Sequence, residues 1–158
     1  MDVYARMKEL NISLPKPPAK AGIYAQAKRF GKDLVYISGC GPVLNEPVKG
    51  KLGKEFDIPQ GQQCARNCML NVLAVLEANI GSLNKVKNCV KILTFVAGTD
   101  TFYDHPAVAN GGSQVLADIF GAEAGTPTRS AIGANALPGN IPVETEALFE
   151  IADGAESV

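Results

Sequence analysis

The chain has 158 residues, a formal net charge of −1 at pH 7 and 46% apolar residues, which is the composition of one globular domain over 1–158. No stretch approaches the roughly 20 consecutive apolar residues of a membrane-spanning helix. The charged first ten residues lead us to expect no signal peptide, and the modest cysteine content leads us to expect reduced thiols in the cytoplasm.

Charge is balanced overall but uneven along the chain. Residues 1–54 hold ten Lys or Arg and four Asp or Glu, whereas residues 55–158 hold five and twelve. A basic half could bind nucleic acid. Because the basic residues are scattered rather than aligned, complementary surfaces within one fold or between identical subunits are favoured. We therefore expect neither a nucleic-acid partner nor a membrane partner.

The first half of the chain predicts a helix, a hairpin and a long helix. Helical spacing predicts an N-terminal helix over 2–10, within an extension that covers 1–14. Runs at 23–30 and 34–38, joined by a Gly-Lys-Asp turn, predict a hairpin. A Gly-, Lys- and Pro-rich loop follows, with a short strand expected near Phe56. Apolar residues then repeat at three and four over 60–80, and a glycine follows in the C-cap position.

The second half predicts a strand over 86–96, a helix from Asp104 that Gly121 closes, and strands over 128–135 and 143–152. A Leu-Pro-Gly-Asn turn at 137–140 joins the last two strands. Both long helices should pack on one face of a mixed sheet. Apart from the N-terminal helix, nothing in the chain can cover the opposite face, which favours an oligomer whose sheets face one another.

The motifs of common cofactor and nucleophile chemistry are absent. The one histidine, His105, stands at a helix start, where a capping or solvated role is favoured. Residues 39–42 look like a glycine loop, but a proline stands where a phosphate loop needs N–H donors, which favours a tight turn. Cys64 and Cys68 share an apolar helix face, which favours core packing over zinc. Cys40, beside a loop, is the candidate for a reactive thiol. We expect no metal and no cofactor.

Arg129 is the candidate for ligand recognition, because it lies in an otherwise uncharged strand. If the last two strands pair, Glu144 or Glu146 can lie beside it in a salt bridge that only stabilises the sheet. The functional interpretation is an anion clamp, since a guanidinium binds a carboxylate bidentately.

Several segments resemble the RidA/YjgF family, also called L-PSP endoribonuclease or translation-inhibitor proteins. The resemblance covers roughly residues 18–152, and its most specific part is the arginine segment with the following Leu-Pro turn and paired glutamates. The N-terminal helix, the longer 43–58 loop and the 110–112 stretch look like a longer, less characterised branch. The matching segments are Ile23-Tyr24, Ile37-Ser38-Gly39, Cys64-Ala65-Arg66 leading into Asn71-Val72, Val90-Lys91 leading into Phe95-Val96, Pro127-Thr128-Arg129-Ser130, Leu137-Pro138 and Val143-Glu144-Thr145-Glu146.

The resemblance implies a chorismate-mutase-like α+β fold, with a six-stranded mixed sheet, two helices on one face and the N-terminal helix added. It also implies a homotrimer with ligand clefts between subunits. Family members hydrolyse imines and enamines such as 2-aminoacrylate and 2-iminopropionate to 2-keto acids and ammonia. Arg129 would hold the substrate carboxylate and Glu144 would position the water. Tyr24, Ser113, the backbone of Gly39 and that of Ala131 would line the pocket.

Such a reaction needs neither metal nor cofactor, because an imine carbon is electrophilic and the task is mainly to position one water. The sequence departs from the family at Ala131, where a cysteine is common, and either Ser113 or Asn110 stands for the family's helix asparagine. Two other functions stay open: a trimer that binds small carboxylates without turnover, and a ribonuclease or translation inhibitor. A chorismate-mutase-type activity would rest on fold analogy alone.

Overall fold

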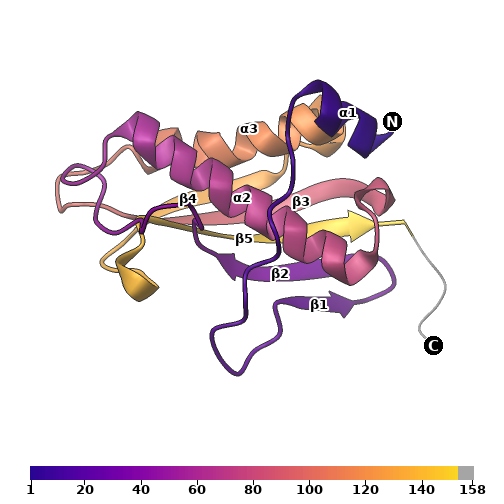
Figure 1. Ribbon diagram of the computed structural model, residues 1–158, viewed down its shortest axis with the longest axis horizontal. Helices are drawn as coiled ribbons and strands as arrows, with labels where there is room; N and C mark the ends of the chain where they lie inside the picture. Colours follow the sequence, from indigo (N-terminus) through magenta and orange to yellow (C-terminus); the bar gives the residue numbers. More distant parts are fainter. Residues whose placement is uncertain (153–158) are drawn as a thin grey trace.

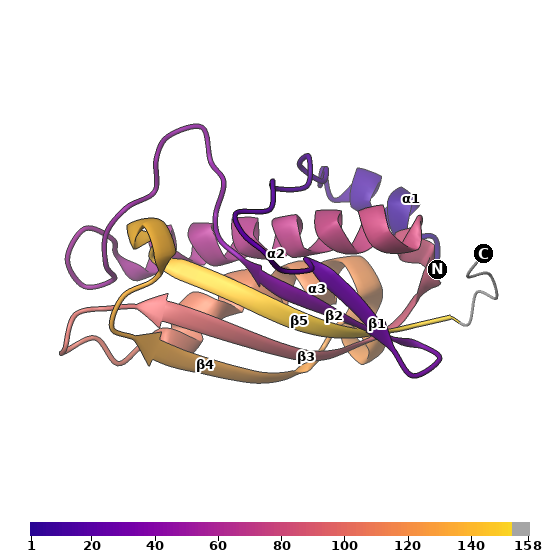
Figure 2. The same cartoon turned by 90° about the horizontal axis from the view of Figure 1, so that it is seen from below.

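A computed structural model describes residues 1–152 and arranges them as a five-stranded sheet with two long helices on one face (Figures 1 and 2). The strands follow the order β1-β2-β5-β3-β4, and all neighbours are antiparallel except β3 and β4. The predicted α+β class and mixed sheet are confirmed. In chain order the elements are α1 (Val3–Glu9), β1 (Ala27–Phe30), β2 (Leu34–Cys40), α2 (Ile58–Ile80), β3 (Val86–Ala97), α3 (His105–Ala124), β4 (Thr128–Ala134) and β5 (Val143–Ile151), with short 3-10 turns at Leu83–Lys85 and Pro138–Asn140.

Local signals set the ends of the two long helices. α2 begins after Asp57, whose side chain accepts from the Gln60 backbone N–H while the Gln60 side chain accepts from the Asp57 N–H. It ends at Gly81, which adopts a left-handed φ of 84°. α3 loses helical geometry at Gly121, where φ is 82°, and one further turn follows. No helix within residues 1–152 is both long and apolar enough to cross a membrane.

Two glycines let α2 and α3 pack closely. A Cβ on Gly111 would collide with the backbone carbonyl of Gln62, and a Cβ on Gly112 would lie 3.0 Å from the carbonyl oxygen of Ala65. These glycines weaken the start of α3 as an isolated helix. In the fold they allow the backbones to approach, so the helix layer stays tight above the sheet.

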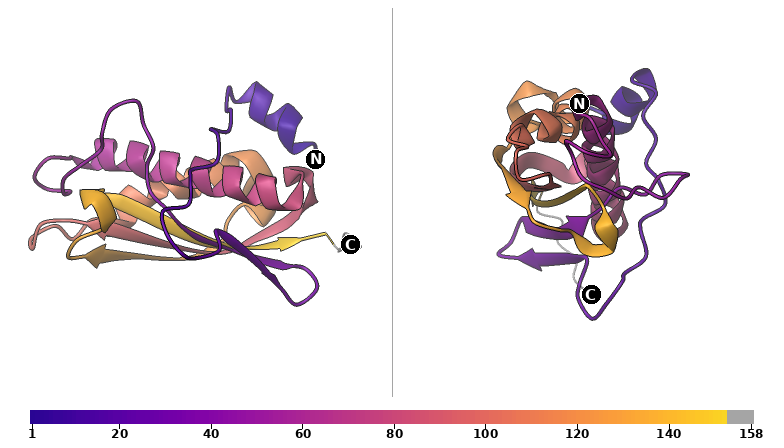
Figure 3. Two further views of the ribbon diagram at one scale, coloured as in Figure 1. Left: turned by 60° about the horizontal axis from the view of Figure 1, so that its bottom comes forward. Right: turned by 90° about the vertical axis from the view of Figure 1, so that its left-hand side faces the viewer.

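The sheet has one buried face and one open face. Along β5, alternate residues from Val143 to Ile151 point toward the helices and are buried. The intervening residues, Glu144 among them, point to the other face, which no described element covers (Figure 3). On that open face Phe30, Tyr36 and Ile132 are 45%, 39% and 45% exposed.

The sixth strand expected near Phe56 does not form. Leu52 makes only single bridges, to Phe56 and Gly98, because Gly50 and Gly53 take positive φ values of 135° and 82° and bend the chain away on both sides. The first strand is also shorter than predicted and begins at Ala27. The preceding segment is an irregular loop, with the Gln26 side-chain amide donating to the Pro18 carbonyl over 2.8 Å.

The last two strands, β4 and β5, do not pair with each other, so the condition for a salt bridge between them is not met. β3 lies between β4 and β5, so that Ile92 is paired with Arg129 on one side and with Ala147 on the other. α3 connects β3 to β4 and is the crossover that two neighbouring parallel strands require. The turn at 137–140 therefore leads the chain past β3 instead of closing a hairpin.

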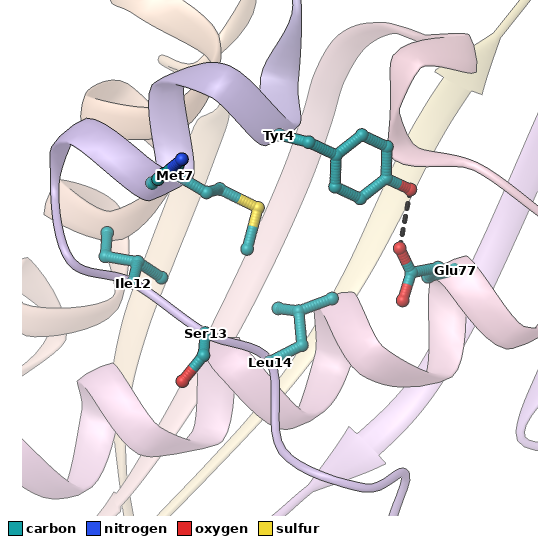
Figure 4. A pocket seen from close by; sticks show the side chains of 7 residues that line it. Tyr4, Met7, Ile12, Ser13, Leu14 and Glu77 are labelled. Atoms are coloured by element: carbon teal, nitrogen blue, oxygen red, sulfur yellow. Dashed lines mark hydrogen bonds between the residues drawn. The ribbon is translucent and has the colours of Figure 1, made fainter.

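α1 lies on the outer side of the helix layer and leaves the open sheet face uncovered (Figure 1). The Tyr4 hydroxyl donates to Glu77 Oε1 of α2 over 2.5 Å, and Arg6 Nε donates to the Asp118 carbonyl of α3 over 3.0 Å. Figure 4 shows the hollow of about 460 Å³ that α1 and the residues after it form with α2. None of the predicted site residues lines it.

Candidate functional site

Arg129 projects from the edge strand β4 toward α3. It stands in register with the buried Ile92, so its side chain is on the helix side of the sheet. Its Nη1 donates to Asn110 Oδ1 over 2.7 Å and to Ser113 Oγ over 3.1 Å. Asn110 and Ser113 are three residues apart on α3 and so share one helix face. The structure thus brings Arg129 together with both candidates for the helix position.

No carboxylate neutralises Arg129 within residues 1–152, where the salt bridges are Arg6–Glu9 and Lys54–Glu55. The predicted alternative of a sheet salt bridge to Glu144 or Glu146 is therefore wrong. Arg129 lines a hollow of about 410 Å³. Its lining residues carry hydroxyls, amides and no acid, and they are Asn110, Ser113, Gln114, Ala117, Gly125, Thr126, Pro127 and Arg129. Such a cation suits a carboxylate ligand.

Glu144 lies over the end of β2. A Cβ on Gly39 would collide with the Glu144 carboxylate, so only glycine leaves that space free. Burial, and then the charge of Glu146, raises the pKa of the Glu144 carboxyl above its usual value. Glu146 itself accepts from the Tyr36 hydroxyl over 2.6 Å, and this bond is the main reason that the pKa of Tyr36 is raised.

Tyr24 and Gly39 line one hollow with Glu144, at the end of β2 on the side of β1. This hollow measures about 580 Å³. Its walls come from the loop before β1, the end of β2 and the segment before β5: Pro18, Ala19, Ala21, Gly22, Tyr24, Gln26, Ser38, Gly39, Cys40, Gly41, Val43, Pro138, Ile141 and Glu144. A half-buried carboxyl with a raised pKa in such a wall can accept a proton from a bound water.

The two hollows share no residue within one chain. Arg129 is on the helix side of the sheet, whereas Glu144 pairs with Phe95 and is on the open side. β3 separates the strands that carry them. Ala131 lies on β4 in register with Thr94, on the same side of the sheet as Arg129. It does not line the Glu144 hollow. The predicted site residues therefore form two groups.

The cysteines are packing residues. Cys40, the candidate reactive thiol, is 6% exposed, and burial followed by the charge of Glu144 raises its pKa to about 12, which keeps the thiolate scarce. Cys64 and Cys68 lie in the core as predicted, and Cys68 Sγ donates to the Val143 carbonyl over 3.4 Å. Among residues 1–152 no three potential metal ligands come together.

His105 is placed by packing that the sequence did not indicate. Its ring meets Phe102 edge-on, with centroids 5.5 Å apart. A Cβ on Gly133 of β4 would lie 2.8 Å from His105 Nε2, so this glycine makes room for the imidazole. His105 is thus held against β4, on the same side of that strand as Arg129 and Ala131.

A family model described as Endoribonuclease L-PSP, the family that includes YjgF and RidA, matches residues 15–151. The chain belongs to the Endoribonuclease L-PSP family. Protein TCP17 of Trypanosoma cruzi is 35% identical to it over 151 residues. The match covers 94% of this chain and 94% of that protein. The 2-iminobutanoate/2-iminopropanoate deaminase of Dermatophagoides farinae is 32% identical over 143 residues, covering 89% of this chain and 94% of that protein.

A solved member of this fold agrees with the architecture. The crystal structure of Atu1372 from Agrobacterium tumefaciens, a protein with unknown function, is similar with a TM-score of 0.84 and 34% identity. The match covers 94% of this chain and 92% of that one. The two chains thus share this Endoribonuclease L-PSP family fold over most of their lengths.

Proposed function

We propose that this protein hydrolyses small 2-imino or enamine acids, of the 2-iminopropionate and 2-aminoacrylate type, to 2-keto acids and ammonia. The observation that carries the proposal is Arg129, a cation at a sheet edge that Asn110 and Ser113 orient and that no carboxylate within residues 1–152 neutralises. The mite relative that is named as such a deaminase supports the same reaction class.

The chemistry follows from two groups. Arg129 binds the substrate carboxylate and fixes the C=N carbon. Glu144 orients a water and accepts its proton as the oxygen adds to that carbon. The proton then passes to the nitrogen, which gives a carbinolamine with a hydroxyl and an amino group on the same carbon. Glu144 next takes the hydroxyl proton and delivers it to the amino group, so that the C–N bond breaks, ammonia leaves and a C=O bond remains. An enamine first takes a proton from solvent on carbon and releases one from nitrogen, which makes it the imine. The raised pKa of Glu144 suits a group that must hold this proton briefly.

We further propose that the complete site forms between subunits of a homotrimer, because Arg129 and Glu144 are on opposite sides of the sheet in one chain. One subunit would contribute Arg129 with Asn110, Ser113 and the backbone at Ala131. Its neighbour would contribute Glu144 with the wall that carries Tyr24 and Gly39. The uncovered open face, where Phe30, Tyr36 and Ile132 are exposed, offers a contact surface for assembly. The four buried, free cysteines are compatible with the reducing cytoplasm that we propose as its compartment.

A coupled turnover assay tests the proposal. A serine dehydratase generates 2-aminoacrylate, and pyruvate formation is followed with and without the protein. We expect acceleration by the wild type and a loss of about 100-fold in Arg129→Ala, because the carboxylate clamp supplies most of the positioning. Arg29→Ala is the matched control, since Arg29 is exposed on β1 and donates only to the Asn79 carbonyl, over 3.3 Å.

Each outcome of this assay decides between the functions. Equal turnover in wild type and Arg129→Ala would contradict the clamp. No acceleration by a folded wild type that still binds pyruvate through Arg129 would favour a carboxylate-binding protein without turnover. Light scattering should give a mass of three times 16.6 kDa. A monomer would remove the site between subunits.

A further inference from the structure

Two asparagines of α2 hold the turn that follows β2. Asn71 Nδ2 donates to the Gly41 carbonyl over 3.0 Å and to Asn67 Oδ1 over 3.4 Å. Asn67 Oδ1 also accepts from the backbone N–H of Val43 over 2.5 Å. The two side chains lie four residues apart on one face of α2. They hydrogen-bond the chain on both sides of Pro42, at Gly41 and at Val43.

The way Asn71 is buried favours a role beyond packing. Its side chain is inaccessible to solvent, and its Oδ1 has no hydrogen-bond partner among residues 1–152. Both of its polar neighbours, the Gly41 carbonyl and Asn67 Oδ1, are acceptors, so the amide nitrogen must face them. A buried, unpaired acceptor lowers stability. A leucine of similar size would avoid that cost on an apolar helix face, but it could not hold the Gly41 carbonyl.

The held turn is a wall of the Glu144 hollow. Gly41 and Val43 both line that hollow, as do Glu144 and Tyr24. On its other side the turn is pressed against the segment before β5, since a Cβ on Gly41 would lie 2.6 Å from Ile141 Cδ1. The turn therefore lies between α2, whose two amides bond to it, and the segment before β5.

We infer that Asn67 and Asn71 are positioning residues, which set the wall opposite Glu144 without touching the substrate themselves. The inference rests on the proposed function, because a positioning role has meaning only where Glu144 and the wall hold a ligand. A displacement of the wall by about 1 Å is enough to misplace a reacting water.

Asn71→Leu separates positioning from stability. We expect the thermal midpoint to shift by only a few degrees, because leucine removes the unpaired oxygen but also deprives the Gly41 carbonyl of its donor, while kcat/KM of the folded protein falls at least about tenfold. Asn79→Leu is the control, since Asn79 is on the same helix and its amide bonds only the Val75 carbonyl. Wild-type kcat/KM in Asn71→Leu would overturn the inference. A fall in activity that merely follows a fall in the folded fraction would also overturn it.

Position 67 allows a rescue by a conservative variant. Asp keeps an acceptor for the Val43 N–H and for Asn71, whereas Ala removes it. We therefore expect Asn67→Asp to keep kcat/KM within about threefold of the wild type and Asn67→Ala to lose about tenfold. Equal loss in both variants would contradict a role through that hydrogen bond.

The buried thiol beside the turn gives a readout that does not need turnover. Cys40 is 6% exposed and directly precedes Gly41 in the same wall. An aromatic disulfide reagent, with labelled sites identified by mass spectrometry, should modify Cys40 at least about tenfold faster in Asn67→Ala and Asn71→Leu. Cys89, 4% exposed in β3, should stay protected as the internal reference. If the wild type shows no turnover and Cys40 becomes reactive in the two variants, the proposed function fails. The role of the two amides in holding the turn then still stands. Unchanged labelling of Cys40 would overturn that role.

Discussion

Replacing Gly39 by alanine tests whether the Glu144 carboxyl must lie over the end of β2. Gly39 has no positive φ, so alanine fits the backbone conformation there. The new methyl group, however, would occupy the place of the carboxylate and would lie 2.9 Å from Glu144 Cδ and 3.1 Å from Cγ. Since the contact is with the end of a side chain, the carboxylate must swing away while the strand stays in place.

The size of the effect follows from these distances. Ordinary carbon–carbon contact is about 3.5–4.0 Å, so the carboxyl has to move by roughly 0.5–1 Å or more. A displacement of about 1 Å in a positioned group can cost on the order of 100-fold in rate. We expect kcat/KM to fall about 10- to 100-fold, which is about 1.4–2.7 kcal/mol of transition-state stabilisation. Stability should change by less than about 1 kcal/mol, because the clash is relieved by a rotamer change.

The assay is keto-acid formation from 2-aminoacrylate, with thermal unfolding measured on the same samples. Gly22→Ala is the comparison, since Gly22 lines the same hollow and a Cβ there meets only the Tyr24 ring, at an ordinary 3.6 Å. We expect less than about a threefold change for that variant. Wild-type kcat/KM in Gly39→Ala, with the fold intact, would refute the view that the place of the Glu144 carboxyl matters for the reaction.

Two further predictions concern titration and the N-terminal helix. Because the pKa of Glu144 is raised in the folded state, the wild type should lose stability relative to Glu144→Gln as pH rises above the ordinary carboxyl range of about 4. Calorimetry on both proteins checks this, and a difference that is independent of pH would contradict it. Tyr4→Phe removes the hydroxyl that bonds Glu77 and the Leu83 N–H, and should cost about 1 kcal/mol, or roughly 2–4 °C in the thermal midpoint. The proposed deaminase activity should not change, since Tyr4 and Glu77 line neither the Arg129 hollow nor the Glu144 hollow; a loss of activity would give α1 a role in the site.

Local chemistry made several elements predictable. The start and end of α2 follow from Asp57 and Gly81, which act within one turn of the helix. The alternation along β5 follows from one buried and one open face. Arg129 could be singled out because a lone cation in an uncharged strand has few roles. The family resemblance pointed to Glu144. The structure adds the reason that position 39 is a glycine: the Glu144 carboxyl occupies the space that a Cβ would fill.

Patterns along the chain were therefore enough to predict the helices, most strands, the α+β class and Arg129 as the residue that would bind a carboxylate. The strand order, in contrast, comes from tertiary contacts: β3 separates β4 from β5, which excludes the alternative salt bridge and leaves Arg129 without an acidic partner in residues 1–152. It also decided that Asn110 and Ser113 together orient Arg129, and that Asn67 and Asn71 hold a distant turn. Strand order and side-chain contacts of this kind join residues far apart in the chain, and the periodicity that reveals a helix or strand carries no information about its partner.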